Sequence, residues 1–265
     1  MLKKQLLQIS TWFDSFVTAF KAESAQEQRN YDLKIEHTAK VRNNIELLAD
    51  SLLLPADKRA LASIIAICHD VGRFPQYAKY GTFNDATSVN HAALAIQTLK
   101  SEGILQILDE VSRDMVIQSI ALHNVFLLPD NLCPDELLFA RLIRDADKLD
   151  IWRVLIEYCT AQPEERASAV VWELPDTGLC SDAAINEVIN GRMINRSVLS
   201  SADDFKLLQI SWAYDLNFKE TFVQLSEHGY IDTLAGLLPD QNGCHGAVSA
   251  VRSFIKSRIV GASYL

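Results

Sequence analysis

Apolar residues recur every three or four positions along most of this 265-residue chain, and this spacing is the strongest constraint on its fold. The period is typical of amphipathic helices with one buried face. It predicts helices over about 2–20, 31–51, 56–70, 88–100, 109–123, 135–160, 182–195, 203–226, 229–238 and 244–261. Strand signals are nearly absent, and the one short candidate, 167–175, is equally compatible with a helix end. We therefore predict an all-α fold.

The segments between these helices are polar or contain glycine and proline. Residues 22–30 are expected to form a loop or a frayed helix end. Gly72 stands where a helix C-terminal glycine belongs. Residues 73–87 follow it without any period and are predicted to form a loop long enough to be functional. No repeat or convincing linker interrupts the chain, so we expect a single all-helical domain over residues 1–265.

Composition excludes some classes of function. The net charge of −9 and the pI near 5.2 disfavour general nucleic-acid binding, because an acidic surface repels phosphate backbones. A small phosphorylated substrate remains compatible if a few cations lie near it. Five cysteines without a C-x-x-C pair argue against a disulfide framework and fit a reducing compartment. No leader and no apolar run of about 18 residues is evident, so we expect a cytoplasmic chain without membrane contact.

Histidines are the first candidates for chemistry. The first four of the six fall in four successive predicted helices, namely His37, His69, His91 and His123. One histidine per helix allows a bundle to gather ligands at its centre from separate helices. A lone histidine is more often structural, but four in register beside acidic residues point to a metal site. The other two, in EHGY and GCHGA, are expected to be structural or solvent-facing.

The sharpest local motif is ICHDVGRF, which contains His69 and Asp70. Adjacent helical side chains project about 100° apart, so these two converge on metal only near a helix end or where the carboxylate bridges two ions. The alternative is a histidine favoured by the helix dipole next to a solvated acid. An acid at a helix C-terminus is unfavourable, so that alternative explains His69 better than Asp70.

A second acidic motif is ARLIRDADKLDIW, in which Asp147 flanks the apolar stripe and can point inward. The alternative for Asp147 is a surface charge paired with Arg144. Asp145 and Asp150 are interpreted as solvated acids or as partners in pairs along the helix.

The ordered set IEHTAKVRNN, CHDVGR and DADKLD resembles the HD-domain metal-dependent phosphohydrolases over about residues 31–155. The resemblance implies an HD core there and a helical extension, or a dimer surface, over about 156–265. It also implies that His37, His69, Asp70 and Asp147 bind one divalent metal. Some subfamilies add two histidines and a second metal, and His91 and His123 occupy those positions. Asp70 would then bridge the two ions.

A site of four histidines and two acids favours two divalent transition-metal ions, among which Fe, Mn, Ni, Co and Zn are all suitable. Such ions lower the pKa of bound water toward ~7, so a metal-bound hydroxide can attack phosphorus. Arg73 and Lys148 are the expected cations for the phosphoryl oxygens, with a surface charge as the alternative for each. Cys68 is expected in the core. The aromatic and basic side chains of 77–83 either frame a base or sugar or anchor their loop.

These observations predict a phosphohydrolase that cleaves a phosphomonoester or phosphodiester of a nucleotide or similar small phosphorylated substrate. No Gly-Tyr-Pro follows the HD pair, so cleavage of cyclic dinucleotides is not supported. Two alternatives stay open: a di-iron HD-type oxygenase, and a nucleotide-binding module without turnover. A homo-oligomer is compatible with the extension.

Overall fold

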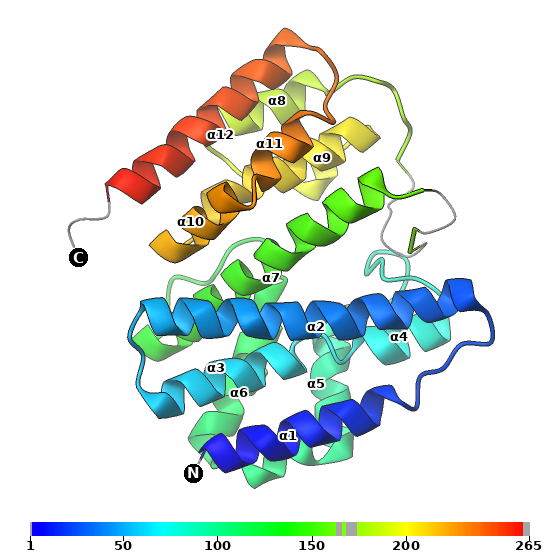
Figure 1. Cartoon of the computed structure of the whole chain (residues 1–265), viewed down its shortest axis with the longest axis vertical. Helices are drawn as coiled ribbons and strands as arrows, with labels where there is room; N and C mark the ends of the chain where they lie inside the picture. The colour runs from blue at the N-terminus through cyan, green and yellow to red at the C-terminus, as the bar shows by residue number, and fades with distance from the viewer. Residues whose placement is uncertain (1, 163–165, 168–173, 262–265) are drawn as a thin grey trace. The chain divides into compact units, whose positions relative to one another are not determined.

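The computed structural model of the chain describes residues 2–162, 166–167 and 174–261, and within these ranges it is built of helices and contains no strand (Figure 1). The predicted all-α fold is confirmed. Residues 168–173, the centre of the short segment predicted as a strand or a helix end, lie outside the described residues. Among the described helices, none combines the length and the apolar composition that a bilayer crossing requires.

The chain divides into two compact units. The first comprises Met1–Ile151 and Ala161–Val170, and the second comprises Trp152–Thr160 and Val171–Leu265. The break falls inside one helix, a few residues before the expected end of the core at 155. The expectation of a single domain stays a prediction.

The first unit packs around its third helix. Its elements are α1 (Leu2–Val17), α2 (Ala25–Ser51), α3 (Ala56–Cys68), α4 (Arg73–Tyr80), α5 (His91–Glu102), the 3-10 turn η1 (Ile104–Ile107), α6 (Glu110–His123) and the first part of α7 (Pro134–Thr160). Every residue of α3 from Ala60 to Cys68 is buried, because α1, α2 and α6 all pack against this helix. Figure 1 shows α2 and α3 lying side by side. The residues that follow Cys68 therefore emerge at the centre of the unit.

Two helices differ from the sequence-based expectation. The first is α2, which begins at Ala25 and so includes most of the predicted loop 22–30. Its start has the S-x-x-E sequence of a capping box: the Ser24 side chain accepts a hydrogen bond from the Glu27 backbone N–H, and its hydroxyl donates to the Glu27 carboxylate at 3.0 Å. The second is α4, which occupies the first half of the predicted loop 73–87. Pro75 lies in its first turn, where a missing N–H costs nothing.

Gly72 is not the left-handed helix terminus that we predicted. Its backbone is right-handed (φ −65°, ψ −21°) and it directly precedes α4. A β-carbon on Gly72 would lie 2.3 Å from the His91 carbonyl oxygen and 2.5 Å from the Ala95 nitrogen. The glycine therefore allows α5 to approach the backbone that follows Asp70.

The second unit consists of shorter helices: α8 (Asp182–Ile189), η4 (Arg196–Val198), α9 (Ala202–Ser211), η5 (Trp212–Asp215), α10 (Lys219–Glu227), α11 (Tyr230–Ala235) and α12 (Asn242–Val260). The predicted helix 203–226 is interrupted after Ser211 by η5 and by an extended residue, Leu216. Trp152 is fully buried in this unit and donates its indole N–H to the Gln209 carbonyl oxygen at 3.0 Å.

Candidate metal centre

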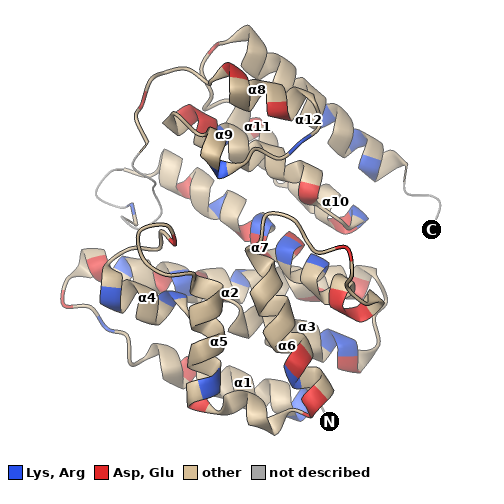
Figure 2. Cartoon of the chain, turned by 180° about the vertical axis from the view of Figure 1, so that it is seen from behind, with Lys and Arg blue, Asp and Glu red and all other residues tan. Residues whose placement is uncertain are grey.

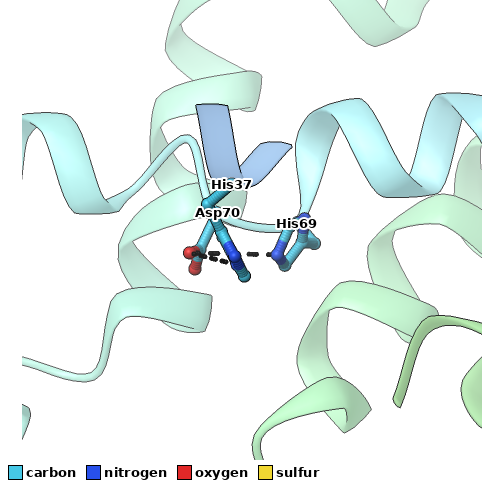
Figure 3. A group of neighbouring side chains, drawn as sticks. All are labelled: His37, His69 and Asp70. Atoms are coloured by element: carbon cyan, nitrogen blue, oxygen red, sulfur yellow. Dashed lines mark ion pairs between the residues drawn. The ribbon is translucent and has the colours of Figure 1, made fainter. Parts of the chain in front are cut away.

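All six predicted metal ligands lie in the first unit, at or near its centre. His37 comes from the middle of α2, and Asp147 from α7. His69 caps the C-terminus of α3 and Asp70 follows it. The other two stand at helix ends: His91 is the first residue of α5 and His123 the last of α6. Figure 3 shows that His37 and the pair at the end of α3 point toward one another.

One oxygen of Asp70 faces a first group of ligands. Its Oδ2 atom lies 3.5 Å from His37 Nε2 and 3.8 Å from His69 Nε2, so these three side chains form a group of metal-ligating atoms. Asp147 joins this group from the opposite helix, with Oδ1 at 3.0 Å from His37 Nε2 and 3.7 Å from His69 Nε2. The prediction that Asp147 points inward agrees with this geometry.

The other oxygen of Asp70 faces a second group. Asp70 Oδ1 lies 3.5 Å from His91 Nε2, and His91 Nε2 lies 2.9 Å from His123 Nε2. These three residues form the second set of atoms able to hold an ion, and all three are buried. The structure thus brings the six predicted ligands together, with Asp70 shared between the two groups.

Each of the four histidine rings is held through its Nδ1 atom. The partners are the Asp150 carboxylate for His37 (2.7 Å), the Ala66 carbonyl oxygen for His69 (2.7 Å), the Asp85 carboxylate for His91 (2.6 Å) and the Ile120 carbonyl oxygen for His123 (2.7 Å). Because carbonyl and carboxylate oxygens accept, each Nδ1 carries the proton. In the neutral rings the Nε2 lone pairs then point to the centre, as in the histidine ligands of metalloproteins; His37 Nε2, at 3.0 Å from Asp147 Oδ1, donates there while its ring is protonated.

Two details test whether these residues fit a cation. The Nε2 atoms of His91 and His123 are both acceptors, yet they face each other at hydrogen-bond distance. The Nε2 atom of His69 is buried without a hydrogen-bond partner. Buried acceptors without a donor are costly, and a bound cation would satisfy all three. The donor set therefore fits divalent metal ions that accept nitrogen ligands.

The electrostatics favour positive charge at the centre. Burial alone would raise the pKa of Asp70, but its electrostatic interactions, led by the charge of Lys34, hold it well below its usual range. Burial likewise opposes ionisation of Asp147, but its hydrogen bond with His37 and the adjacent His69 ring hold its pKa well below normal. Both acids are therefore ionised at neutral pH, as metal ligands must be.

The pKa shifts of the histidines differ between the two groups. Burial lowers the pKa of His123 to about 3, with His91 and His69 adding to the effect. Burial and the nearby Arg73 also lower the pKa of His91. These two rings are thus neutral, the form that binds metal. Burial and the charge of Lys34 would lower the pKa of His37 as well, but its hydrogen bonds with Asp147 and Asp150 raise that pKa overall.

The predicted phosphate-binding cations have different surroundings. Arg73 lies beside the site, with Nε at 3.4 Å from Asp70 Oδ1, but its Nη1 atom donates to Gln76, to the Phe83 carbonyl oxygen and to Asp85 at 2.6–2.9 Å. Lys148 is buried next to Asp147. The role of both residues toward substrate stays a prediction. A third cation, Lys34, contacts Asp70 directly at 2.8 Å and was not predicted.

The acids on α7 need a correction. Both acidic and basic residues lie along this helix (Figure 2), and Asp145 and Asp150 are 0% and 2% exposed, which excludes the first of the two expectations for them, that of solvated acids. Asp150 lies one helical turn after Asp147 and holds His37. That spacing is the signal that could have identified it. Arg144 is also buried and donates to backbone carbonyls that follow α6, among them Val125 at 2.5 Å.

The other side chains singled out in the sequence lie where they were predicted, and for Tyr77 the structure favours one of the two alternatives. Cys68 is fully buried and burial raises its pKa to about 12, which agrees with a core role. His228 and His245 are exposed. Tyr77 is buried on α4, accepts a hydrogen bond from Asn30 at 2.8 Å and packs against Phe83. This arrangement favours an anchoring role for Tyr77.

Comparison with known families agrees with this geometry. The family model described as the HD domain matches residues 35–152, which include all six candidate ligands. The resemblance to the HD domain is thus shown for residues 35–152. Domains of this family are in general metal-dependent phosphohydrolases that bind divalent metals. No curated protein and no solved structure matches the chain. The matched region coincides with the predicted core to within a few residues at each end.

Proposed function

We propose that this protein is a metal-dependent phosphohydrolase that uses two divalent transition-metal ions to cleave a phosphomonoester or phosphodiester of a nucleotide or a similar small phosphorylated molecule. The observation that carries the proposal is the position of Asp70, whose two oxygens face two separate groups of inward-pointing histidine nitrogens. Two-metal sites of this kind clamp the attacking and leaving oxygens of an in-line displacement.

The chain supplies positioning and electrostatics. Bound metal ions would polarise a phosphoryl oxygen and lower the pKa of a water molecule toward ~7. Asp70 holds the two groups at a fixed separation, and the Nδ1 hydrogen bonds keep the four rings in one orientation. Burial of the histidines excludes bulk water, which strengthens interactions with developing charge. Asp147 has a side-chain exposure of 14%, so substrate can reach the cluster there.

The test uses the full chain loaded separately with Mn, Fe, Co, Ni or Zn. Phosphate release is measured over a panel of nucleotides and sugar phosphates. We expect turnover by the wild type with at least one metal, and none by Asp70→Asn, which keeps the shape of the side chain but loses its charge. The control is Asp14→Asn, an exposed acid on α1, whose activity should equal that of the wild type. Circular dichroism checks that both variants stay helical.

Three results would overturn the proposal. Full activity of Asp70→Asn would mean that hydrolysis does not depend on this site. Substrate-dependent oxygen uptake by iron-loaded protein without phosphate release would instead indicate an oxygenase. Nucleotide binding without turnover under every metal would indicate a binding module.

A further inference from the structure

Lys34 lies on α2 one helical turn before His37, so both side chains project from the same face of the helix. Its ammonium group is 2.8 Å from Asp70 Oδ2, the oxygen that also faces His37 and His69. A positive charge therefore already stands beside the first group of candidate ligands. Sequence alone does not separate this lysine from the other charges on α2.

Solvent reaches the cluster on the side of Lys34. Its side chain is 15% exposed and that of Asp147 is 14% exposed, whereas those of His37 and His69 are 2% and 0% exposed. Of the two more exposed groups, Lys34 contacts Asp70 Oδ2 at 2.8 Å and Asp147 Oδ1 lies 3.0 Å from His37 Nε2. A substrate that enters there meets the ammonium group of Lys34 before it meets the buried rings.

Arg73, the cation that the sequence suggested, is held by other partners. Its Nη1 atom donates to the Asp85 carboxylate, the Gln76 amide oxygen and the Phe83 carbonyl oxygen. Asp85 in turn holds His91, so moving Arg73 toward a substrate would disturb a ligand of the second group. Arg73 is therefore suited to support the site and less suited to follow a substrate.

The side chain of Lys34 contacts fewer groups than that of Arg73. Asp70 is its one carboxylate partner in the described residues, and its ammonium group also lies 5.4 Å from the centre of the Phe83 ring, a neutral cation–π partner. A metal ion on Asp70 Oδ2 would compete for that oxygen and repel the ammonium group. A lysine has a flexible stem and three donors, so Lys34 can turn to another anion close by.

We infer that Lys34 binds the anionic phosphoryl group of the substrate, beside the Phe83 ring. The inference rests on the proposed phosphohydrolase function and names a substrate-binding residue for it. The chemical class it recognises is a phosphoryl group with at least one free anionic oxygen. A hydrogen bond from a charged donor to such an oxygen is among the stronger polar contacts.

Binding of inorganic phosphate to the metal-loaded full chain tests this inference by calorimetry, independently of turnover. The variants are Lys34→Ala, Lys34→Arg and the control Lys40→Ala, an exposed lysine on the same helix. We expect the dissociation constant to rise about 10-fold or more in Lys34→Ala, to recover in part in Lys34→Arg and to stay unchanged in Lys40→Ala. Metal content, measured for each protein, should be the same in all four.

Three results overturn the inference. Wild-type affinity in Lys34→Ala would show that Lys34 does not contact phosphate. Weaker binding together with a lower metal content in Lys34→Ala would show that the lysine acts on Asp70 and the metals instead. If the metal-loaded wild type itself binds no phosphate, the proposed function fails as well, whereas the first two results leave that function standing.

Discussion

His91 and His123 face each other with their Nε2 atoms 2.9 Å apart, while each ring donates its Nδ1 proton to an oxygen elsewhere. Neither inward nitrogen carries a proton, so the contact is repulsive unless a cation lies between or beside the rings. These two histidines stand at the ends of different helices and are 5% exposed. Their approach is therefore a property of the fold and predicts how the protein responds to metal.

Removing either ring should remove one metal ion. Wild-type protein is expected to bind two ions per chain, and His91→Ala and His123→Ala one each, as measured by elemental analysis after dialysis. Metal at 100 times its dissociation constant stabilises a fold by about 2.7 kcal/mol per site, or roughly 5–10 °C in melting temperature for a chain of this size. Each variant should lose the part of this gain that the second ion supplies. His245→Ala, at an exposed histidine, is the control, and unchanged stoichiometry in both site variants would contradict the two-metal arrangement.

The two acids that hold histidine rings should act on different ions. Asp85→Asn is expected to weaken binding at the group that contains His91, and Asp150→Asn at the group that contains His37. Loss of such an orienting carboxylate typically costs 10–100-fold in metal affinity. Stepwise titration against a chelator separates the two events, and each variant is the control for the other. Equal losses at both steps from either variant would refute this division.

Gly72→Ala should disturb the second group from a distance. The added methyl group would overlap the His91 carbonyl oxygen and the Ala95 nitrogen, so α5 must move. We expect about 1–3 kcal/mol of destabilisation, the usual cost of overpacking, measured by denaturant unfolding. The affinity for the second ion should fall as well. Gly246→Ala is the matched control, because the nearest atom to its added carbon is Ile189 Cδ1 at 3.8 Å, and the substitution favours the helix by about 1 kcal/mol. Equal effects from both would refute the steric explanation.

The second unit offers a prediction that depends on pH. Burial opposes ionisation of Asp204, but its carboxylate accepts hydrogen bonds from the Ser181 N–H at 2.7 Å and from Ser200 N–H and hydroxyl at 2.9 and 2.8 Å, and its pKa is lowered overall. A lowered pKa stabilises the fold above the unfolded value of ~3.9, and the effect is lost as the pH falls through the folded value.

Asp204→Asn should therefore lower the free energy of unfolding by about 1–3 kcal/mol at pH 7, because the Ser181 and Ser200 donors lose a charged acceptor. The difference from wild type should shrink as the pH is lowered below about 4. Urea unfolding at a series of pH values measures it. A difference that is constant with pH would mean that the charge of Asp204 contributes nothing.

Much of the fold follows from the helical period, and the exceptions have local causes. The predicted ranges of α3, α6 and α7 agree with the observed helices to within two residues at each end. The period missed the first turns of α2, where the residues after Ser24 are polar and the capping box is the signal. It also missed α4, a helix of 8 residues with Pro75 in its first turn, which is too short to show a clear period. Proline in a first turn is tolerated, and nothing local distinguished that position.

The site was predictable where ligands recur in order, and less so where they depend on tertiary contacts. His37, His69-Asp70 and Asp147 form a recognisable series, and the structure brings them together with His91 and His123. Asp85 lies between helices without any period, so only the fold shows that it holds His91. The role of Gly72 depends on the closeness of α5, a distance that no sequence pattern expresses.

Because one carboxylate is common to both groups, the two ions of the proposed site would not bind independently. The first ion would change the charge and rotamer of Asp70 that the second ion meets, and the free energy of that coupling would be the same whichever ion arrives first. Such a site would behave as a single thermodynamic unit, with an apparent affinity for either ion that depends on the concentration of the other.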